Sequence, residues 1–160
     1  MTETIIHFKG MADYDGGDVL PPIERGSEFR DPCPAEECIQ ERLRNGATLE
    51  SLVIKHANYS IGWSPGVTFT KSLEVAEEFA SRLGREAGKM GVIIEVELPI
   101  SQVWSIRDLV SKGCIGALGP GRLNLSLDQV LKEQEHIILG RISASCVRRV
   151  IKLEDRQVLR

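Results

Sequence analysis

The sequence has little of several features that mark common classes of protein. It has four cysteines, none of them in a Cys-x-x-Cys pair, and three scattered histidines, so neither a zinc site nor a redox motif is indicated. Its formal net charge of −3 provides no positive field that would attract nucleic acid or an anionic membrane surface. We therefore expect no metal, no nucleic-acid partner and no membrane partner.

Long apolar runs are also missing. No stretch approaches the length of a membrane span, and the first ten residues have neither the basic region nor the apolar region of a cleaved signal peptide. We expect a chain that is cytoplasmic as encoded, or exported without a cleaved Sec signal. The even number of cysteines would permit two disulfides in an oxidising compartment, although free structural thiols are the simpler interpretation.

The composition that is present is ordinary for a globular protein. With 160 residues, 42% of them hydrophobic and 27% charged, the sequence predicts a single domain over residues 1–160, in which residues 1–26 form an N-terminal strand and loop extension. Apolar spacing predicts helices at 35–44 and 49–57 and a third helix capped by Ser72. Strands are predicted at 5–8, 67–70, 91–98, 102–106, 136–142 and 147–153, and a Gly-rich loop at 112–124. This order favours an α+β fold with mainly antiparallel pairing.

Two carboxylates stand just before an apolar run near the end of the chain. Glu133 and Glu135 precede Ile137-Ile138-Leu139, and in an extended segment they would lie on one face about 6.5 to 7 Å apart, at roughly 3.3 Å per residue. One carboxylate of such a pair can stabilise a cationic sugar transition state while the other takes a proton from the nucleophile. By itself, Glu-x-Glu is typical of a solvated acidic surface, so the rest of the chain must support the catalytic interpretation.

Further segments give the acidic pair a context. In chain order they are Phe29-Arg30-Asp31, Leu52 to Ala57 with His56, Val67 to Ala76 with Thr68 and Thr70, and Glu133 to Gly140. This order resembles the mono-ADP-ribosyltransferase toxins of the cholera toxin and heat-labile enterotoxin type, which combine an arginine, a Ser-Thr-Ser strand and a Glu-x-Glu pair. Threonines and a central Phe69 stand where that family usually has Ser-Thr-Ser, and threonine keeps the hydroxyl donor.

The resemblance implies a fold and an activity. The fold would be ADP-ribosyltransferase-like, with two packed, mainly antiparallel sheets flanked by helices around an NAD cleft. The activity would move ADP-ribose from NAD to an arginine side chain of a target protein and release nicotinamide. NAD would be the substrate, and an activating or inhibiting protein partner is a further option. A chain of this kind would be an effector or toxin that acts in the cytosol of a target cell.

The resemblance also implies roles for individual residues. Glu135 would oppose the charge of the sugar cation, and Glu133 would orient and deprotonate the acceptor. Arg30 would bind the phosphate or ribose side of NAD, and the hydroxyls of Thr68 and Thr70 would belong to the cofactor-binding strand. His56 would lie near the adenosine ribose.

Several alternatives stay open at this point. Arg30 has the simpler interpretation of a surface ion pair with Glu28 or Asp31, and Arg25 or Lys9 would be other choices for its role. Thr68 suits a strand by propensity alone, and His56 suits a helix surface or a partly buried position. As a whole, the chain would alternatively be an NAD glycohydrolase, or a non-catalytic NAD-binding or interaction module of the same fold.

Overall fold

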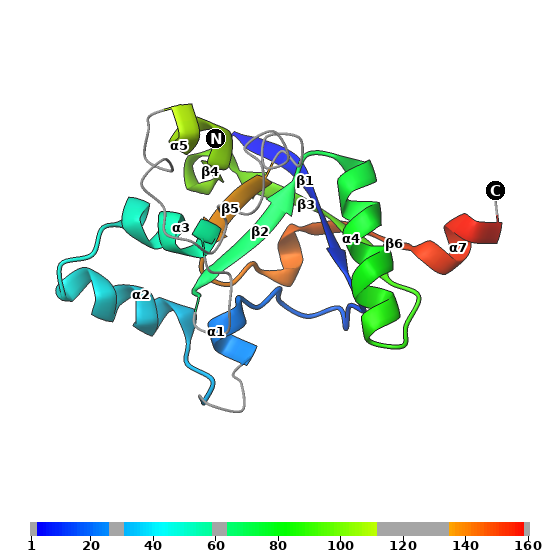
Figure 1. The fold of residues 1–160 in the computed structure, drawn as a ribbon, viewed down its shortest axis with the longest axis horizontal. Coiled ribbons are helices and arrows are strands. Elements are labelled where there is room, and N and C mark those ends of the chain that lie inside the picture. Colours follow the sequence, from blue (N-terminus) through cyan, green and yellow to red (C-terminus); the bar gives the residue numbers. More distant parts are fainter. Residues whose placement is uncertain (1–2, 26–30, 59–63, 112–134, 159–160) are drawn as a thin grey trace. The chain divides into compact units, whose positions relative to one another are not determined.

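The structure, a computed structural model, describes residues 3–25, 31–58, 64–111 and 135–158 (Figure 1). Its elements in chain order are β1 (Thr4–Met11), α1 (Pro22–Arg25), α2 (Ala35–Arg44), α3 (Leu49–Asn58), β2 (Gly66–Thr70), α4 (Leu73–Glu86), β3 (Val92–Pro99), β4 (Trp104–Ser105), α5 (Ile106–Ser111), β5 (Glu135–Leu139), β6 (Val147–Lys152) and α7 (Leu153–Val158), with short 3-10 turns at Ile100–Gln102 and Ala144–Cys146.

The strands form one sheet with helices, which confirms the mixed α and β character expected from the sequence. The hydrogen-bonded order is β4-β5-β2-β1-β3-β6. The pairs β1–β2, β1–β3, β3–β6 and β4–β5 are antiparallel, as predicted. The expected two packed sheets are not confirmed, because β2 has β5 as one neighbour and β1 as the other, so the described strands belong to a single sheet.

The chain divides into two compact units. The first unit comprises residues 1–17, 69–102 and 143–160, and the second comprises residues 18–68 and 103–142. The last residues of β2 belong to the first unit and its first residues to the second. A single domain over residues 1–160 stays a prediction.

The first unit is built on the long pairing of β1 with β3. Thr4 lies opposite Pro99 at one end, Met11 lies opposite Val92 at the other, and β6 pairs with the outer side of β3. The predicted alternation of β3 is confirmed, since Val92, Ile94, Val96 and Leu98 are buried while Glu95 and Glu97 are half-buried. Ile93 on the second face is buried as well, in a cluster with Ala76 and Ala80 of α4 and Leu153 of α7.

Helix α4 lies against β1 and β3 in this unit (Figure 1). Its predicted N-cap is confirmed, because the Ser72 hydroxyl accepts a hydrogen bond from the Val75 amide at 3.2 Å. A glycine on β1 allows the close approach of the helix. A Cβ at Gly10 would lie 2.2 Å from the Ala76 carbonyl oxygen and 2.5 Å from the Ala80 nitrogen, so a side chain has no room there.

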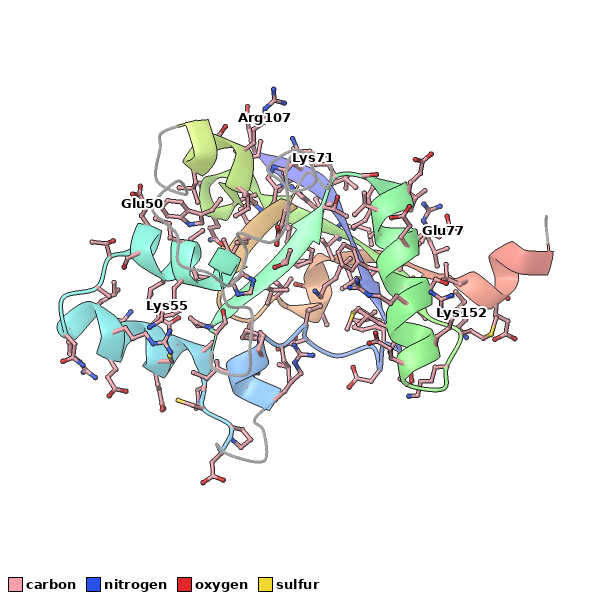
Figure 2. The ribbon with its side chains drawn as sticks, in the orientation of Figure 1. Glu50, Lys55, Lys71, Glu77, Arg107 and Lys152 are labelled. Atoms are coloured by element: carbon pink, nitrogen blue, oxygen red, sulfur yellow. The ribbon has the colours of Figure 1, made fainter. Side chains whose placement is uncertain are left out.

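The second unit packs α3 and α5 against β5. Its buried cluster joins Val53 and Ala57 of α3, Ile106 and Leu109 of α5, and Ile137 of β5. The two helices carry charged side chains outside the cluster, with Glu50 and Lys55 on α3 and Arg107 on α5 (Figure 2). This division into an apolar and a charged side is the ordinary pattern of helices that cover a sheet.

The second unit also confirms the predicted helix at 35–44. The helix ends at Arg44. The amide of its C-cap residue Asn45 bonds back into the last turn, and Gly46 follows with φ +98°. A smaller cluster packs Ala35 and Cys38 of α2 against Ile23 of α1.

Short elements differ from the sequence-based expectations. The strand expected at 102–106 is the two-residue β4, and helix α5 begins at Ile106. Helices α1 and α7 were not expected, and β5 covers Glu135–Leu139 rather than 136–142. The Gly-rich loop expected at 112–124 lies outside the described residues.

Cys33, Cys38 and Cys146 are free thiols. No helix among the described residues is long and apolar enough to cross a membrane.

Candidate functional site

A buried histidine at the end of α3 holds two hydroxyls. His56 is 3% exposed, and its Nδ1 forms a short hydrogen bond with the Ser64 hydroxyl. Its Nε2 lies 2.6 Å from the hydroxyl oxygen of Thr68. The interpretation of His56 as a helix-surface residue is therefore wrong. Thr68 does more than satisfy the β-propensity of its strand, because its hydroxyl ties β2 to α3.

A glycine at the start of β2 makes room for this ring. A Cβ at Gly66 would lie 2.9 Å from both Cγ and Nδ1 of His56, and 3.3 Å from Cγ2 of Ile137. The Gly66 amide also donates to the Ser64 hydroxyl oxygen at 3.1 Å. Gly66 thus contributes both the space for the imidazole and a donor that fixes its partner hydroxyl. A glycine inside a strand often marks such a close approach.

Strands β2 and β5 are neighbours that run in opposite directions. The amide of Gly140, just after β5, donates to the carbonyl of Pro65, just before β2, at 2.7 Å. The end of β5 therefore lies beside the start of β2. Because the two strands are adjacent in the sheet order, their directions must be opposite.

This arrangement places Glu135 and Thr68 on the same face of the sheet. The close approach of Gly66 to the Ile137 side chain shows that these two positions face the same side of the sheet. Side chains two residues apart share a face, so Thr68 faces the same side as Gly66, and Glu135 the same side as Ile137. In antiparallel strands the step from Gly66 to Thr68 and the step from Ile137 to Glu135 run in the same direction. Thr68 and Glu135 therefore face one side of the sheet on neighbouring strands.

Glu135 is a buried carboxylate beside an apolar cluster. It is 6% exposed, whereas carboxylates are rarely buried in proteins unless they are partnered or functional. Ile137 and Leu139, which follow it on the same face of β5, pack in the cluster with α3 and α5. Exclusion of water from such a position strengthens the interaction of the carboxylate with any positive charge placed next to it.

The segment that follows β5 is anchored by an ion pair. The Arg141 guanidinium lies 2.8 Å from Glu24 of α1 and 3.4 Å from Asp18, and Ile142 forms an isolated bridge with Val19. The hydrogen bond and the charge of Glu24, with a smaller contribution from Asp18, raise the pKa of Arg141 above its ordinary value. These contacts fix the end of β5 opposite the end that carries Glu135.

The other sequence-predicted site residues have different outcomes. The Thr70 side chain is buried and accepts a hydrogen bond from the Ser72 amide at 3.0 Å, so its hydroxyl helps to form the turn into α4. Thr70 lies in the first unit, whereas His56, Thr68 and Glu135 lie in the second. Arg30 and Glu133 lie outside the described residues.

The structure describes both of the residues, Arg25 and Lys9, that are alternatives to Arg30 as the NAD-binding cation. Arg25 is an exposed residue at the end of α1 in the second unit. Lys9 is on β1 in the first unit, with its ammonium 5.8 Å from the centre of the Phe69 ring. Neither the place of Arg25 nor the contact of Lys9 identifies the cation that would bind NAD, and that assignment stays a prediction.

Two residues of the site, Ser64 and Gly66, were not found from the sequence. Within the described part of the chain, no group of three or more His, Cys, Asp or Glu side chains is placed to hold a metal ion. Comparison with known protein families and with curated proteins gives no match for this sequence.

Proposed function

We propose that the protein is a mono-ADP-ribosyltransferase, with an ADP-ribosyltransferase-like fold, that moves ADP-ribose from NAD to an arginine side chain of a target protein. One observation carries this proposal: Thr68 and Glu135 face the same side of neighbouring strands, and His56 binds the Thr68 hydroxyl. These are three of the residues that the resemblance to the toxin family selects, and they come from three separate segments of the chain.

The proposed reaction needs a group that opposes positive charge. When the bond between the ribose C1′ and the nicotinamide nitrogen breaks, nicotinamide leaves with the electron pair and the ribosyl group becomes an oxocarbenium ion. The Glu135 carboxylate would oppose this charge and accept a hydrogen bond from a ribose hydroxyl. A guanidinium nitrogen of the target then forms the new bond to C1′ and loses a proton, for which Glu133 is the proposed base.

The burial of Glu135 supports this role. Preorganised groups in a water-excluded site contribute more to the transition state than the same groups in water, and loss of one such group lowers the rate by about 100- to 1,000-fold. A carboxylate at a solvated surface would have a much smaller effect. The presence of Ile137 and Leu139 on the same face is consistent with such a site.

The experiment measures nicotinamide release from NAD by the purified chain, with and without a small guanidine such as agmatine as acceptor. We expect the Glu135→Gln variant, which keeps the shape and removes the charge, to lose about 100- to 1,000-fold in kcat. The matched control is Glu86→Gln, which removes an exposed carboxylate from α4 and is expected to leave the rate unchanged. Equal rates in wild type and Glu135→Gln reject the mechanism.

The acceptor decides between the transferase and its alternatives. Transfer predicts an ADP-ribosyl-guanidine product that disappears in Glu133→Ala, while that variant keeps part of its NAD hydrolysis. Nicotinamide release with free ADP-ribose as the only product would identify a glycohydrolase. NAD binding without release would identify a non-catalytic module. The proposed place of action is a cytosol that contains both NAD and the target protein.

A further inference from the structure

The positions of the protons in the Ser64–His56–Thr68 chain follow from a count of donors and acceptors. The Ser64 hydroxyl has one proton to donate, and its oxygen already accepts a hydrogen bond from the Gly66 amide. Ser64 is 3% exposed, so water does not substitute for a missing protein partner. Among the described residues, the acceptor that its proton reaches is Nδ1 of His56.

The opposite arrangement leaves a buried proton without an acceptor. If Nδ1 carried the hydrogen and donated it to Ser64, the serine oxygen would accept both from His56 and from Gly66. Its own proton would then have no partner among the described residues. A buried donor without an acceptor is strongly disfavoured. The arrangement in which Ser64 donates to a bare Nδ1 gives the serine proton an acceptor and leaves the serine oxygen to accept from Gly66.

A bare Nδ1 also fixes the direction of the hydrogen bond between His56 and Thr68. The neutral imidazole then carries its hydrogen on Nε2 and donates it to the hydroxyl oxygen of Thr68, 2.6 Å away. The Thr68 hydroxyl oxygen therefore accepts from His56, and this hydrogen bond joins β2 to α3 with a defined direction.

We propose that Ser64 is a positioning residue that selects the Nε2–H tautomer of His56 and, through it, makes His56 the donor to the Thr68 hydroxyl oxygen. The orientation of the Thr68 hydroxyl is then set before NAD binds. The catalytic importance of these hydrogen bonds rests on the proposed function. The arrangement of the hydrogen bonds is independent of that function.

The packing around the ring makes this arrangement rigid. The side of the imidazole that carries Nδ1 lies against the Gly66 backbone, where an added Cβ would lie 2.9 Å from the ring. Val53 and Ala57, which flank His56 on α3, are both buried in the apolar cluster of the second unit. A ring flip would exchange Nδ1 and Nε2 with carbon atoms and break both hydrogen bonds, so the tautomer is the variable that Ser64 controls.

The first test is spectroscopic and needs no activity. Nitrogen-15 NMR of the imidazole distinguishes a protonated ring nitrogen from a bare one, and a His56→Gln variant identifies the His56 signals. We expect wild type to show a protonated Nε2 and a bare Nδ1 at neutral pH. In Ser64→Ala, which removes the donor to Nδ1, we expect the signals to move toward the Nδ1–H tautomer. Wild type with a protonated Nδ1, or a Ser64→Ala spectrum with unchanged tautomer, overturns the proposal.

The second test asks whether the tautomer matters for the reaction. We expect Ser64→Ala to lower kcat for nicotinamide release about tenfold, because the other tautomer of His56 reverses the direction of the Thr68 hydroxyl at the proposed site. Ser64→Thr keeps the hydroxyl and is expected to recover most of the loss. Ile106→Val is the control for a small change in the core of the same unit, and its kcat is expected to equal that of wild type.

The two proposals fail in different ways. If wild type releases no nicotinamide, the proposed function fails while the NMR spectrum still decides the tautomer. If the tautomer changes in Ser64→Ala and kcat does not, the positioning role is refuted and the proposed function stands.

Discussion

Replacement of Gly66 by alanine tests the geometry of the candidate site most directly. The φ of Gly66 lies outside the left-handed region, so alanine adopts this backbone without strain. The effect must come from the added methyl group. It would lie 2.9 Å from Cγ and Nδ1 of His56 and 3.3 Å from Cγ2 of Ile137, and both of these side chains are buried.

The size of the effect follows from what must move. Insertion of a methyl group into a packed interior costs about 1–3 kcal/mol. If the imidazole shifts to relieve the contact, a hydrogen bond to Ser64 or Thr68 breaks inside the protein, and a buried group without a partner costs about 1–3 kcal/mol more. Together, Gly66→Ala is expected to destabilise by about 2–6 kcal/mol, a large part of the roughly 5–15 kcal/mol that stabilises a typical protein.

Stability is measured by urea denaturation of the purified variant. In a second measurement, the nitrogen-15 signals of His56 in the folded variant show whether the ring keeps its hydrogen bonds. Gly17→Ala is the matched control, because the three atoms nearest to a Cβ there all belong to the side chain of the exposed Asp15. Its stability is expected to stay within about 1 kcal/mol of wild type. If Gly66→Ala is as stable as Gly17→Ala and keeps the wild-type His56 signals, the described contact between Gly66 and the ring is wrong.

Two further predictions concern the first unit. Gly10→Ala would place a Cβ 2.2 Å from a carbonyl oxygen of α4, and since backbone cannot rotate away, we expect a loss of about 3 kcal/mol in urea denaturation; an unchanged midpoint would contradict the close packing of α4 on β1. The hydrogen bond from Thr4, and then the hydrogen bond and charge of Arg148, lower the pKa of Glu97 below its ordinary value of 4.5. A carboxylate whose pKa is lower in the folded state contributes stability that is fully present above the pKa of the unfolded state. This stability is lost as the pH falls through the pKa of the folded state. Glu97→Gln should therefore be less stable than wild type at neutral pH, and the two stabilities should converge in acid; a difference that stays constant with pH would exclude this cause.

The longest elements were predictable from the sequence because local signals agree with their burial. Helix α4 has a serine cap and apolar residues at helical spacing, and its cap and buried alanines match the expectation. Strand β3 alternates cleanly and lies inside the sheet, where the alternation is needed. In both cases the pattern extends over several turns or residue pairs, so one position does not decide the outcome.

The short elements were not predictable for the converse reason. β4 has only two residues, and its existence depends on pairing Trp104 with Ile137 of β5, which is far away in the sequence. Helix α5, which follows β4, has only six residues, and such a short segment shows too little periodicity for the sequence to indicate a helix. Helix α1 likewise depends on burial of Ile23 against α2, and its four residues carry too little periodicity to indicate a helix.

Sequence reasoning selected candidate residues where chemistry selects residue types, and it missed their neighbours where geometry selects them. Thr68, His56 and Glu135 were selected because hydroxyl, imidazole and carboxylate groups have functions that a motif records, and the structure shows the contact between His56 and Thr68. Ser64 and Gly66 lie in Ser-Pro-Gly, which is typical of any turn before a strand. What distinguishes this turn is that the glycine is the first residue of β2 rather than part of the loop, in a position where a residue with a side chain would pair better. A glycine in such a position is explained by a buried ring that approaches its backbone, and the buried polar ring needs partners, which are the hydroxyls two residues before and two residues after Gly66. The same reasoning, applied to the sequence, would turn Ser64-Pro-Gly66-Val-Thr68 from a turn signal into a search for the imidazole that fits between its two hydroxyls.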